Sequence, residues 1–406
     1  MSSHSRKIVP KPLDPASRLP KAEVERMFSL IRGSRLPESN IVPGADWDYG
    51  IPLTRLKELR DFWLDSWSFD DFLAEISQWE HYTVEIEQND VHYVHIKSGK
   101  EGAIPLLMTH GWPGSFYEFH KVVGPLTSPT SEADPVFHIV LPSLPGYGFS
   151  GPPPRKGWTL IDSARVFNTL MVDVLGHKEY VAQGGDWGYC VTRALTANHS
   201  DHCRLAHFNI LLEFPPPAYQ WPFLIALFAL PKWVGRRVCG LILSEREMDS
   251  LAKQVQFRDS GMGYISIQGS KPATIGYALN DHPVGLLAYI GEKYHSWSDP
   301  NKPISDAEIV STISLYFLTQ TFGTSVLPYF ETKDAFMRLP KQGKGSKSAV
   351  SVFKHDVLGA PRSWVTGKLN IAFYKEHDAG GHFVGFEQPE TLVADVREFV
   401  KGNWKK

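Results

Sequence analysis

The feature that most constrains this chain is a five-residue turn, Gly184-Gly185-Asp186-Trp187-Gly188. Residues 180–183 predict a short strand before the turn, and residues 189–198 predict a helix after it. A sharp turn from strand to helix requires glycine on both sides, because a Cβ there would collide with the neighbouring backbone. The turn therefore predicts an α/β fold in which Asp186 occupies the apex, where such turns usually carry a nucleophilic serine.

Aspartate at the apex changes the chemistry that the turn can perform. A serine must lose a proton before it attacks, whereas a carboxylate is already ionised and can displace a leaving group from saturated carbon. Asp186 therefore disfavours a serine esterase. Glycine and aspartate also recur in ordinary turns, so the interpretation depends on the rest of the chain.

Composition favours a globular enzyme and excludes several other classes. The chain has 406 residues, 42% of them hydrophobic, and a net charge of -2, which gives no general attraction to nucleic acid or to an acidic membrane surface. Three cysteines are typical of reduced thiols in a cytosolic protein, and we interpret Cys190, close to the turn, as a buried structural thiol.

No segment has the pattern of a signal peptide or a membrane anchor. Residues 1–20 are polar and proline-rich, and they lack the apolar run of a signal peptide. The most apolar segment, residues 221–234, contains two prolines and a lysine and is shorter than the ~20 residues that span a bilayer. We therefore expect a soluble, cytoplasmic protein, and we interpret residues 221–234 as part of a lipophilic cover over a site.

The order of patterns along the chain predicts four segments. Residues 1–100 form an N-terminal extension, with helical spacing near residues 56–63 and strand-like alternation in Val91, Tyr93 and Val94. Strand-and-loop patterns in residues 101–212 indicate the first half of a core with a mostly parallel sheet. The long, aromatic-rich stretch 213–338 predicts an inserted helical cap, and residues 339–406 predict the second half of the core, ending in a helix.

Two loops after later strands supply partners for Asp186. Asp356 follows the predicted strand 349–353, and His382 lies in a loop after the predicted strand 369–374. Nucleophile, acid and then histidine is the chain order of an α/β-hydrolase triad, in which the histidine is the base and the acid orients its ring. Taken alone, each residue could have a purely structural role instead, His382 in packing and Asp356 in capping or closing a turn. His377 and Asp378 are nearby alternatives, which we expect on the approach to the loop.

The segment His110-Gly111-Trp112-Pro113 follows the predicted strand 104–109. It places the backbone amide of Trp112 where it could face a negative oxygen together with the amide of Trp187, as in an oxyanion hole. The two indole rings are also candidates for lining a substrate site, although packing in the core is the commoner role of aromatic residues.

With these motifs, the chain resembles the epoxide hydrolases of the α/β-hydrolase superfamily, specifically the microsomal-type group and its soluble fungal members. The resemblance covers nearly the whole chain and includes three further motifs: Val91-His92-Tyr93-Val94-His95-Ile96-Lys97, Lys271-Pro272-Ala273-Thr274-Ile275-Gly276, and Gly380-Gly381-His382-Phe383 with Phe386-Glu387-Gln388-Pro389-Glu390. It implies the α/β-hydrolase fold with a helical cap inserted after the nucleophile half and an N-terminal extension. It also implies Asp186 as nucleophile, Asp356 as the acid and His382 as the base.

The resemblance further implies two cap tyrosines that donate to the epoxide oxygen. The matching positions are Tyr264, which lies close to the motif at residues 271–276, and Tyr329, with Tyr316 as its main competitor. Two departures stand out. Many relatives have glutamate at the acid position or Phe-Pro before it, whereas this chain has Asp356 after Phe353-Lys354-His355, and microsomal members begin with a membrane anchor that this sequence lacks.

The sequence thus predicts hydrolysis of a small lipophilic epoxide by water, without an organic cofactor or a metal. Haloalkane dehalogenase is the nearest rival, because it also joins an aspartate nucleophile to a histidine, but its halide needs N–H donors rather than an acid. A noncatalytic ligand-binding protein of the same fold is a third alternative. The sequence permits a homodimer and does not require one.

Overall fold

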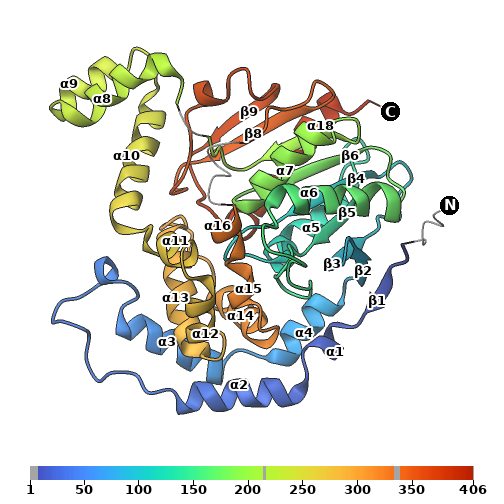
Figure 1. Ribbon diagram of the computed structural model, residues 1–406, viewed down its shortest axis with the longest axis vertical. Helices are drawn as coiled ribbons and strands as arrows, with labels where there is room; N and C mark the ends of the chain where they lie inside the picture. Colours follow the sequence, from blue (N-terminus) through green and yellow to red (C-terminus); the bar gives the residue numbers. More distant parts are fainter. Residues whose placement is uncertain (1–7, 214–215, 333–338, 406) are drawn as a thin grey trace.

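A single sheet runs through the structure, a computed structural model that describes residues 8–213, 216–332 and 339–405. Within these ranges the sheet has nine strands in the order β1-β2-β3-β5-β4-β6-β7-β8-β9 (Figure 1). The strands are β1 (Lys11–Leu13), β2 (His81–Ile86), β3 (Asn89–Ile96), β4 (Ile104–Thr109), β5 (Phe137–Pro142), β6 (Tyr180–Gly184), β7 (Cys203–Phe208), β8 (Lys347–Phe353) and β9 (Ile371–His377).

Most of the sheet is parallel. Strands β5, β4, β6, β7, β8 and β9 pair in parallel, whereas β1, β2 and β3 form an antiparallel edge that joins the rest through β3 and β5. The predicted α/β-hydrolase fold with a mostly parallel sheet is therefore confirmed. Parallel strands bring their carboxyl ends to one edge of a sheet, so the loops after β4, β6, β8 and β9 meet there.

Helices of the core pack in pairs against the sheet. Helices α6 and α7 contact each other, as do α5 and α18. The core helices are α5 (His120–Thr127), α6 (Leu160–Thr169), α7 (Trp187–Asn198), α17 (Val384–Glu387) and α18 (Pro389–Asn403). The predicted C-terminal helix is confirmed by α18, whose apolar residues Leu392, Val396, Phe399 and Val400 are all buried.

A group of helices lies between β7 and β8 in the chain and forms the cap. Its helices are α8 (Trp221–Ala229), α9 (Lys232–Cys239), α10 (Glu245–Ser260), α11 (Gly263–Gln268), α12 (Pro272–Leu279), α13 (Pro283–Ser296), α14 (Asp306–Leu318), α15 (Phe322–Ser325) and α16 (Leu327–Glu331). This matches the expected place of the cap. The exact domain boundaries remain a prediction.

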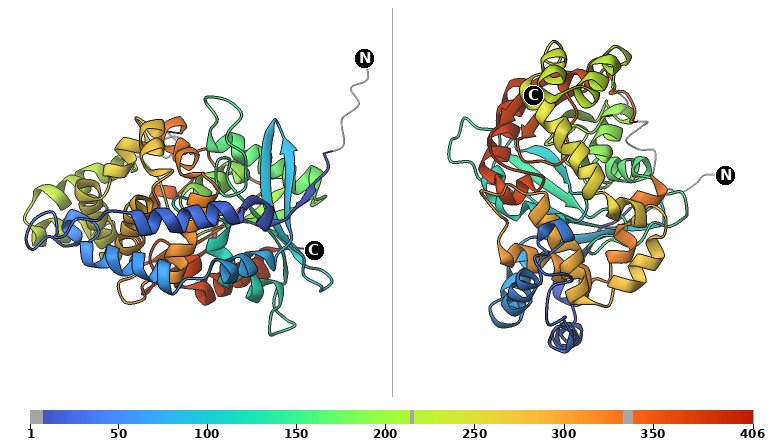
Figure 2. Two further views of the ribbon diagram at one scale, coloured as in Figure 1. Left: turned by 90° about the horizontal axis from the view of Figure 1, so that it is seen from below. Right: turned by 90° about the vertical axis from the view of Figure 1, so that its left-hand side faces the viewer.

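The N-terminal extension supports both the sheet and the cap. It contributes β1, β2 and β3 together with α1 (Pro15–Arg18), α2 (Lys21–Gly33), α3 (Leu53–Asp65) and α4 (Phe69–Ser77). Helices α2 and α3 contact the cap helices α13 and α14, and the left view of Figure 2 shows the blue helices of the extension lying across the cap. Two side-chain contacts cross this boundary, an ion pair of Arg26 with Asp281 at 2.6 Å and a hydrogen bond from Trp67 Nε1 to Ser311 Oγ at 2.9 Å.

Strand β3 departs from the alternation predicted for its sequence. Val91, Tyr93 and Val94 are buried as expected, but His92 between them is buried too. The reason is that β3 lies inside the sheet, between β2 and β5, and is covered on both faces. His92 is accommodated by polar neighbours, with its Nε2 2.9 Å from His81 Nδ1 and its Nδ1 2.9 Å from Ser143 Oγ.

The apolar segment at residues 221–234 does not cover a site. It forms α8 and the start of α9, a helical hairpin at the far end of α10 and away from α11 and α16 (Figure 1). Trp233 is 74% exposed and Ile225 62% exposed. The predicted cover over the site is therefore wrong for this segment, because α8 and α9 contact each other away from the site (Figure 1) and leave much of their apolar surface exposed.

Within the described residues, every helix is too short or too polar to cross a membrane. All three cysteines are unpaired and buried. Burial raises the pKa of Cys190 well above its ordinary value, so this thiol is not a ready nucleophile, in agreement with the predicted structural role.

Candidate active site

The turn at residues 184–188 has the geometry of a nucleophile elbow. Strand β6 ends at Gly184, α7 begins at Trp187, and Asp186 between them has a φ of +49°. Such a backbone conformation is strained for a residue with a side chain and is found at functional sites. A Cβ on Gly184 would overlap the carbonyl of Gly188, and one on Gly188 would overlap the carbonyl of Thr109 in β4. The glycines are therefore required by the close approach of neighbouring backbones.

The structure brings Asp186, His382 and Asp356 together. His382 Nε2 lies 3.5 Å from Asp186 Oδ2, and His382 Nδ1 lies 3.1 Å from Asp356 Oδ1. The backbone amide of Leu358 also donates to Asp356 Oδ1, at 3.1 Å. The histidine thus stands between two carboxylates, one at the apex of the elbow and one in the loop after β8, which is the arrangement that a base and its orienting acid require.

Electrostatics at His382 follow from this position. Burial opposes a charge on the ring, but the carboxylates of Asp356 and Asp186 outweigh it and raise the pKa of His382 well above its ordinary value. While Asp186 is a free carboxylate, the two contacts therefore favour the protonated ring. Both carboxylates stabilise it, and each contact is made by a different ring nitrogen.

The loop that carries His382 is held by residues that the sequence analysis did not identify as functional. The backbone amide of His382 donates to the carbonyl of Trp297, at 2.9 Å. The buried carboxylate of Glu387 accepts from the amides of Gly381 and Phe383, both at 2.9 Å. Asp299, which follows α13, accepts from the amide of Gly380 at 2.8 Å. Glu387 lies in a motif of the resemblance, but no sequence signal identified Trp297 or Asp299.

His377 and Asp378, the nearby alternatives to His382 and Asp356, lie outside the site. His377 is the last residue of β9, and its Nε2 lies 2.6 Å from Asp395 of α18. Asp378 has 93% of its side chain exposed and pairs with Arg246 at 3.0 Å. Both residues are on the approach to the loop, as expected.

The loop after β4 packs directly against Asp186. The amide of Trp112 donates to Asp186 Oδ1 at 2.8 Å, and Gly111 leaves the space that this carboxylate occupies. His110 shapes the loop from inside, because its Nε2 accepts from the amide of Leu144 at 3.2 Å and its Nδ1 donates to the carbonyl of Gly111 at 3.0 Å. Burial lowers the pKa of His110 to about 4, which keeps it neutral.

An aromatic wall faces Asp186 from the cap. The ring of Tyr264 stacks on Trp112 at a centroid distance of 5.3 Å, and Tyr329 packs edge-on against Trp187 at 4.7 Å. The two tyrosine rings are 5.6 Å apart and nearly perpendicular. Burial, followed by the nearby Asp186 carboxylate, raises the pKa of Tyr264. The pKa of Tyr329 is also raised, first by burial and then by Tyr264 and Asp186, so both hydroxyls stay protonated.

Tyr316, the competitor of Tyr329, has another partner. Its hydroxyl donates to the carbonyl of Gly114 at 2.8 Å, and its ring packs near Tyr147 at 6.4 Å. This contact fixes the loop after β4 against α14. Tyr329, in contrast, contacts both Trp112 and Trp187 beside the elbow.

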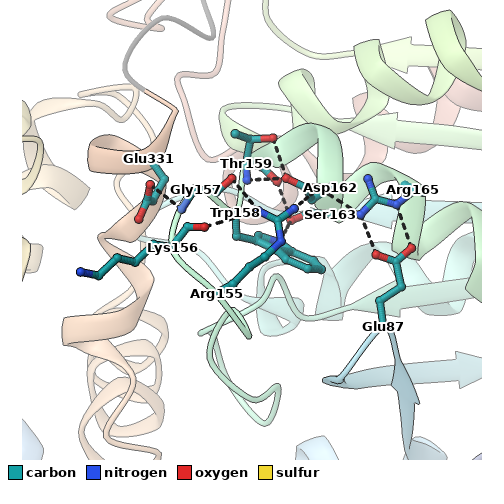
Figure 3. Close-up of polar contacts among 10 residues, drawn as sticks. All are labelled: Glu87, Arg155, Lys156, Gly157, Trp158, Thr159, Asp162, Ser163, Arg165 and Glu331. Carbon is teal, nitrogen blue, oxygen red and sulfur yellow. Dashed lines mark hydrogen bonds and ion pairs between the residues drawn. The ribbon is translucent and has the colours of Figure 1, made fainter.

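The helix that carries Tyr329 is tied to the core by a polar network (Figure 3). Glu331, at the end of α16, accepts from the amide of Gly157 at 3.0 Å. The loop that contains Gly157 continues to Asp162 in α6, which pairs with Arg165 at 3.0 Å, and Arg165 makes a bidentate contact with Glu87 of the N-terminal extension at 2.8 and 2.6 Å. Extension, core and cap are thereby joined beside Tyr329.

These features define a class of protein: an α/β hydrolase with a helical cap and an aspartate at the apex of its nucleophile elbow. Two family descriptions match the chain, "Epoxide hydrolase N terminus" over residues 14–119 and "alpha/beta hydrolase fold" over residues 104–235. Epoxide hydrolase 1 of Sus scrofa is 33% identical to it over 87% of this chain and 81% of its own length. The chain belongs to the epoxide hydrolase family.

Solved structures of relatives agree with this assignment. The epoxide hydrolase of Aspergillus niger superposes with a TM-score of 0.84 at 32% identity and covers 98% of each chain. The juvenile hormone epoxide hydrolase of the silkworm Bombyx mori superposes with a TM-score of 0.86 at 27% identity, covering 98% of this chain and 96% of its own.

Proposed function

We propose that this protein hydrolyses epoxides to vicinal diols through a covalent ester on Asp186. The observation that carries the proposal is that polar residues of the core and tyrosines of the cap meet at Asp186. Asp186 contacts His382, which contacts Asp356. The hydroxyl-bearing rings of Tyr264 and Tyr329 pack against Trp112 and Trp187, the tryptophans of the two loops that meet at Asp186. The apolar rings of Trp112 and Trp187 suit a small lipophilic epoxide, with water as the second substrate.

In the first step, the Asp186 carboxylate attacks a ring carbon of the epoxide. A carbon–oxygen bond of the strained ring breaks as the ester bond forms, and Tyr264 and Tyr329 donate hydrogen bonds to the departing oxygen. The epoxide alkoxide is a much stronger base than a phenolate, so a tyrosine with a raised pKa is still acidic enough to give it a proton.

In the second step, His382 removes a proton from water, which attacks the ester carbonyl of Asp186. The amides of Trp112 and Trp187 face the developing oxyanion, and one such donor contributes on the order of 3 kcal/mol. The bond between Cγ of Asp186 and the alkyl oxygen then breaks. The diol therefore leaves with an oxygen of the original carboxylate, and the water oxygen stays on Asp186.

Formation of the ester prepares the base for this second step. Asp186 is one of the two carboxylates that raise the pKa of His382. When Asp186 becomes a neutral ester, its charge is lost and the pKa of His382 falls, because an imidazolium is less favoured beside a neutral group. His382 is then able to accept a proton from water at the stage when this is needed.

The decisive experiment follows oxygen atoms through one turnover. The enzyme in excess is mixed with an aryl or alkyl epoxide in heavy-oxygen water, and the diol is examined by mass spectrometry. The first diol should carry an unlabelled oxygen from Asp186, and the label should appear in the peptide that contains Asp186. Label in the first diol would exclude the covalent route.

Haloalkane dehalogenation can be distinguished from epoxide hydrolysis by measuring the product, halide or diol. The cap tyrosines provide hydroxyl donors where a departing alkoxide needs a proton, which favours epoxide opening over halide release. Chloride release from a chloroalkane should be negligible beside diol formation from an epoxide of similar size. Comparable rates would contradict the proposal.

A further inference from the structure

A small cavity lies behind the elbow, on the side of Asp186 and His382 that faces the core. Its volume is about 20 Å³, and its wall includes Asp186, His382, Glu118 and the backbone of Gly185. About 10–15 Å³ is enough for one water molecule, provided that the water has two to four polar partners. The cavity therefore has the size of a site for water rather than for an epoxide.

Two further wall residues present polar atoms with no protein partner within the described part of the chain. Thr109 and Gln183 are both at most 1% exposed, and Thr109 Oγ1 and Gln183 Oε1 are buried without a hydrogen bond. A buried polar group without a partner is costly, and bound water is the usual way to satisfy it. The wall thus adds two hydrogen-bonding groups to Asp186, His382 and Glu118.

Asp186 and Glu118 carry the carboxyl groups of this wall, and the mechanism above does not use Glu118. It lies in the short helix Phe116–Phe119 after the Trp112 loop and is packed between two glycines. A Cβ on Gly114 would overlap its carboxyl group, and a Cβ on Gly385, beside the base loop, would overlap its backbone. These two positions hold Glu118 against the loops of Asp186 and His382.

We infer that Glu118 is a positioning residue for the water that hydrolyses the ester, which it holds in this cavity between its own carboxyl group and His382. The inference rests on the proposed function and deepens it. Burial raises the pKa of Glu118 to about 8, so the group is protonated at neutral pH. A neutral carboxyl group has one acceptor oxygen and one O–H donor, and neither adds negative charge beside the ester.

The step balances with the groups already named. One proton of the water passes to His382 Nε2, and the other is held in a hydrogen bond to the acceptor oxygen of Glu118. The water oxygen forms its bond to Cγ of Asp186, and the bond from Cγ to the alkyl oxygen breaks. The alkoxide of the diol then takes a proton from the imidazolium of His382. The second proton of the water, left on the new carboxyl group of Asp186, passes to His382, which restores the free carboxylate and the protonated ring.

This role predicts a pH dependence of the second step. Glu118 faces His382, Asp186, Glu387 and Tyr294. Burial is the largest cause of its raised pKa, and Glu387 still favours its protonated form when Asp186 is an ester. As the pH rises through its pKa, Glu118 ionises and places a negative charge beside the oxyanion that forms on Asp186. Ester hydrolysis should therefore slow at alkaline pH in the native protein.

The test measures ester formation and ester hydrolysis separately, by rapid mixing and intact-mass spectrometry with an aryl epoxide. Glu118→Ala should form the ester at about the native rate but hydrolyse it roughly tenfold to a hundredfold more slowly. Glu118→Gln keeps one acceptor and a donor, so it should hydrolyse the ester at near the native rate without slowing at alkaline pH. Native hydrolysis by Glu118→Ala, or an alkaline decline kept by Glu118→Gln, would overturn the inference.

Two further variants guard against a general loss of folding. Gly114→Ala leaves Glu118 in the chain but places a methyl group where its carboxyl lies, so it should slow hydrolysis in the same way. Glu75→Ala is the control. The carboxylate of Glu75 accepts from the hydroxyl of Tyr117, the residue before Glu118, at 2.9 Å, but Glu75 is not part of the cavity wall. Its loss should leave ester hydrolysis at the native rate. Equal slowing by Glu75→Ala would contradict the inference. If the native protein formed no ester at all, the proposed function itself would fail.

Discussion

The two sides of the candidate active site are built in different ways. On the core side, Asp186, Asp356 and His382 lie on loops after β6, β8 and β9 and are linked to one another by polar contacts. On the cap side, Tyr264 and Tyr329 come from the short helices α11 and α16 and contact their neighbours through rings. In the proposed mechanism, the core side supplies the groups for ester hydrolysis and the cap side supplies the acids for ring opening. The difference predicts that changes on each side slow different steps.

The largest effect is expected from Asp186→Ala. Removal of the nucleophile should abolish both steps, with a loss of diol formation of at least about 10⁴-fold, as for other residues on which a covalent step depends. Intact-mass spectrometry should detect no ester. A variant that kept substantial activity would show that another group attacks the epoxide.

His382→Gln should separate the two sides most clearly. The ester should form on Asp186 and accumulate, because its hydrolysis loses general-base catalysis worth roughly 10²–10⁴-fold. The protein mass should rise by the mass of the epoxide and stay raised for many turnovers of the native protein. If His382→Gln forms no ester, the histidine acts before or during ring opening.

The cap side is tested by Tyr264→Phe and Tyr329→Phe. Each change removes one hydroxyl donor to a developing negative charge, worth about 1.5–3 kcal/mol, and should slow ester formation roughly tenfold to a hundredfold. Tyr316→Phe is the matched control, because its hydroxyl donates to the carbonyl of Gly114, and it should change ester formation much less. If Tyr316→Phe slowed ester formation more than Tyr329→Phe, Tyr316 rather than Tyr329 would be the second donor to the epoxide oxygen.

A smaller effect is expected at the contact that holds α16 to the core. Glu331→Ala removes the acceptor for the amide of Gly157 and loosens the helix of Tyr329. The loss of one such hydrogen bond, about 0.5–1.5 kcal/mol, should slow ester formation by roughly twofold to tenfold and leave hydrolysis unchanged. Glu331→Gln keeps an acceptor oxygen and should approach the native rate. If Glu331→Ala slowed only ester hydrolysis, the cap side would not act mainly on ester formation, and the proposed division of steps between the two sides would be wrong.

The same comparison explains what the sequence could predict. Asp186, Asp356 and His382 follow strands, and the order of parallel strands places such loops at one edge, so local patterns were enough to bring them together. The start of α7 at Trp187 rather than Tyr189 is a small correction at the apex of the elbow. Nothing local places Trp297 or Asp299 against the His382 loop, because that contact depends on how the cap packs.

The hairpin of α8 and α9 shows the limit of composition. Its sequence is apolar enough to predict a cover over the site. The position of the hairpin, however, depends on contacts with residues that are distant in the sequence. The result is an exposed Trp233 and Ile225 rather than a wall over Asp186. Glu118 was missed for a similar reason, since only the folded structure places its carboxyl group beside both Asp186 and His382.

The contacts of residues 297–299 have a consequence for engineering. The carbonyl of Trp297 and the carboxylate of Asp299 belong to the cap segment after α13, yet they hold the backbone of Gly380 and His382. The cap is therefore not an interchangeable module that only selects the substrate. A chimaera that took its cap from a relative would also lose the native contacts that hold His382, unless residues 297–299 and the loop 380–387 were exchanged as one unit.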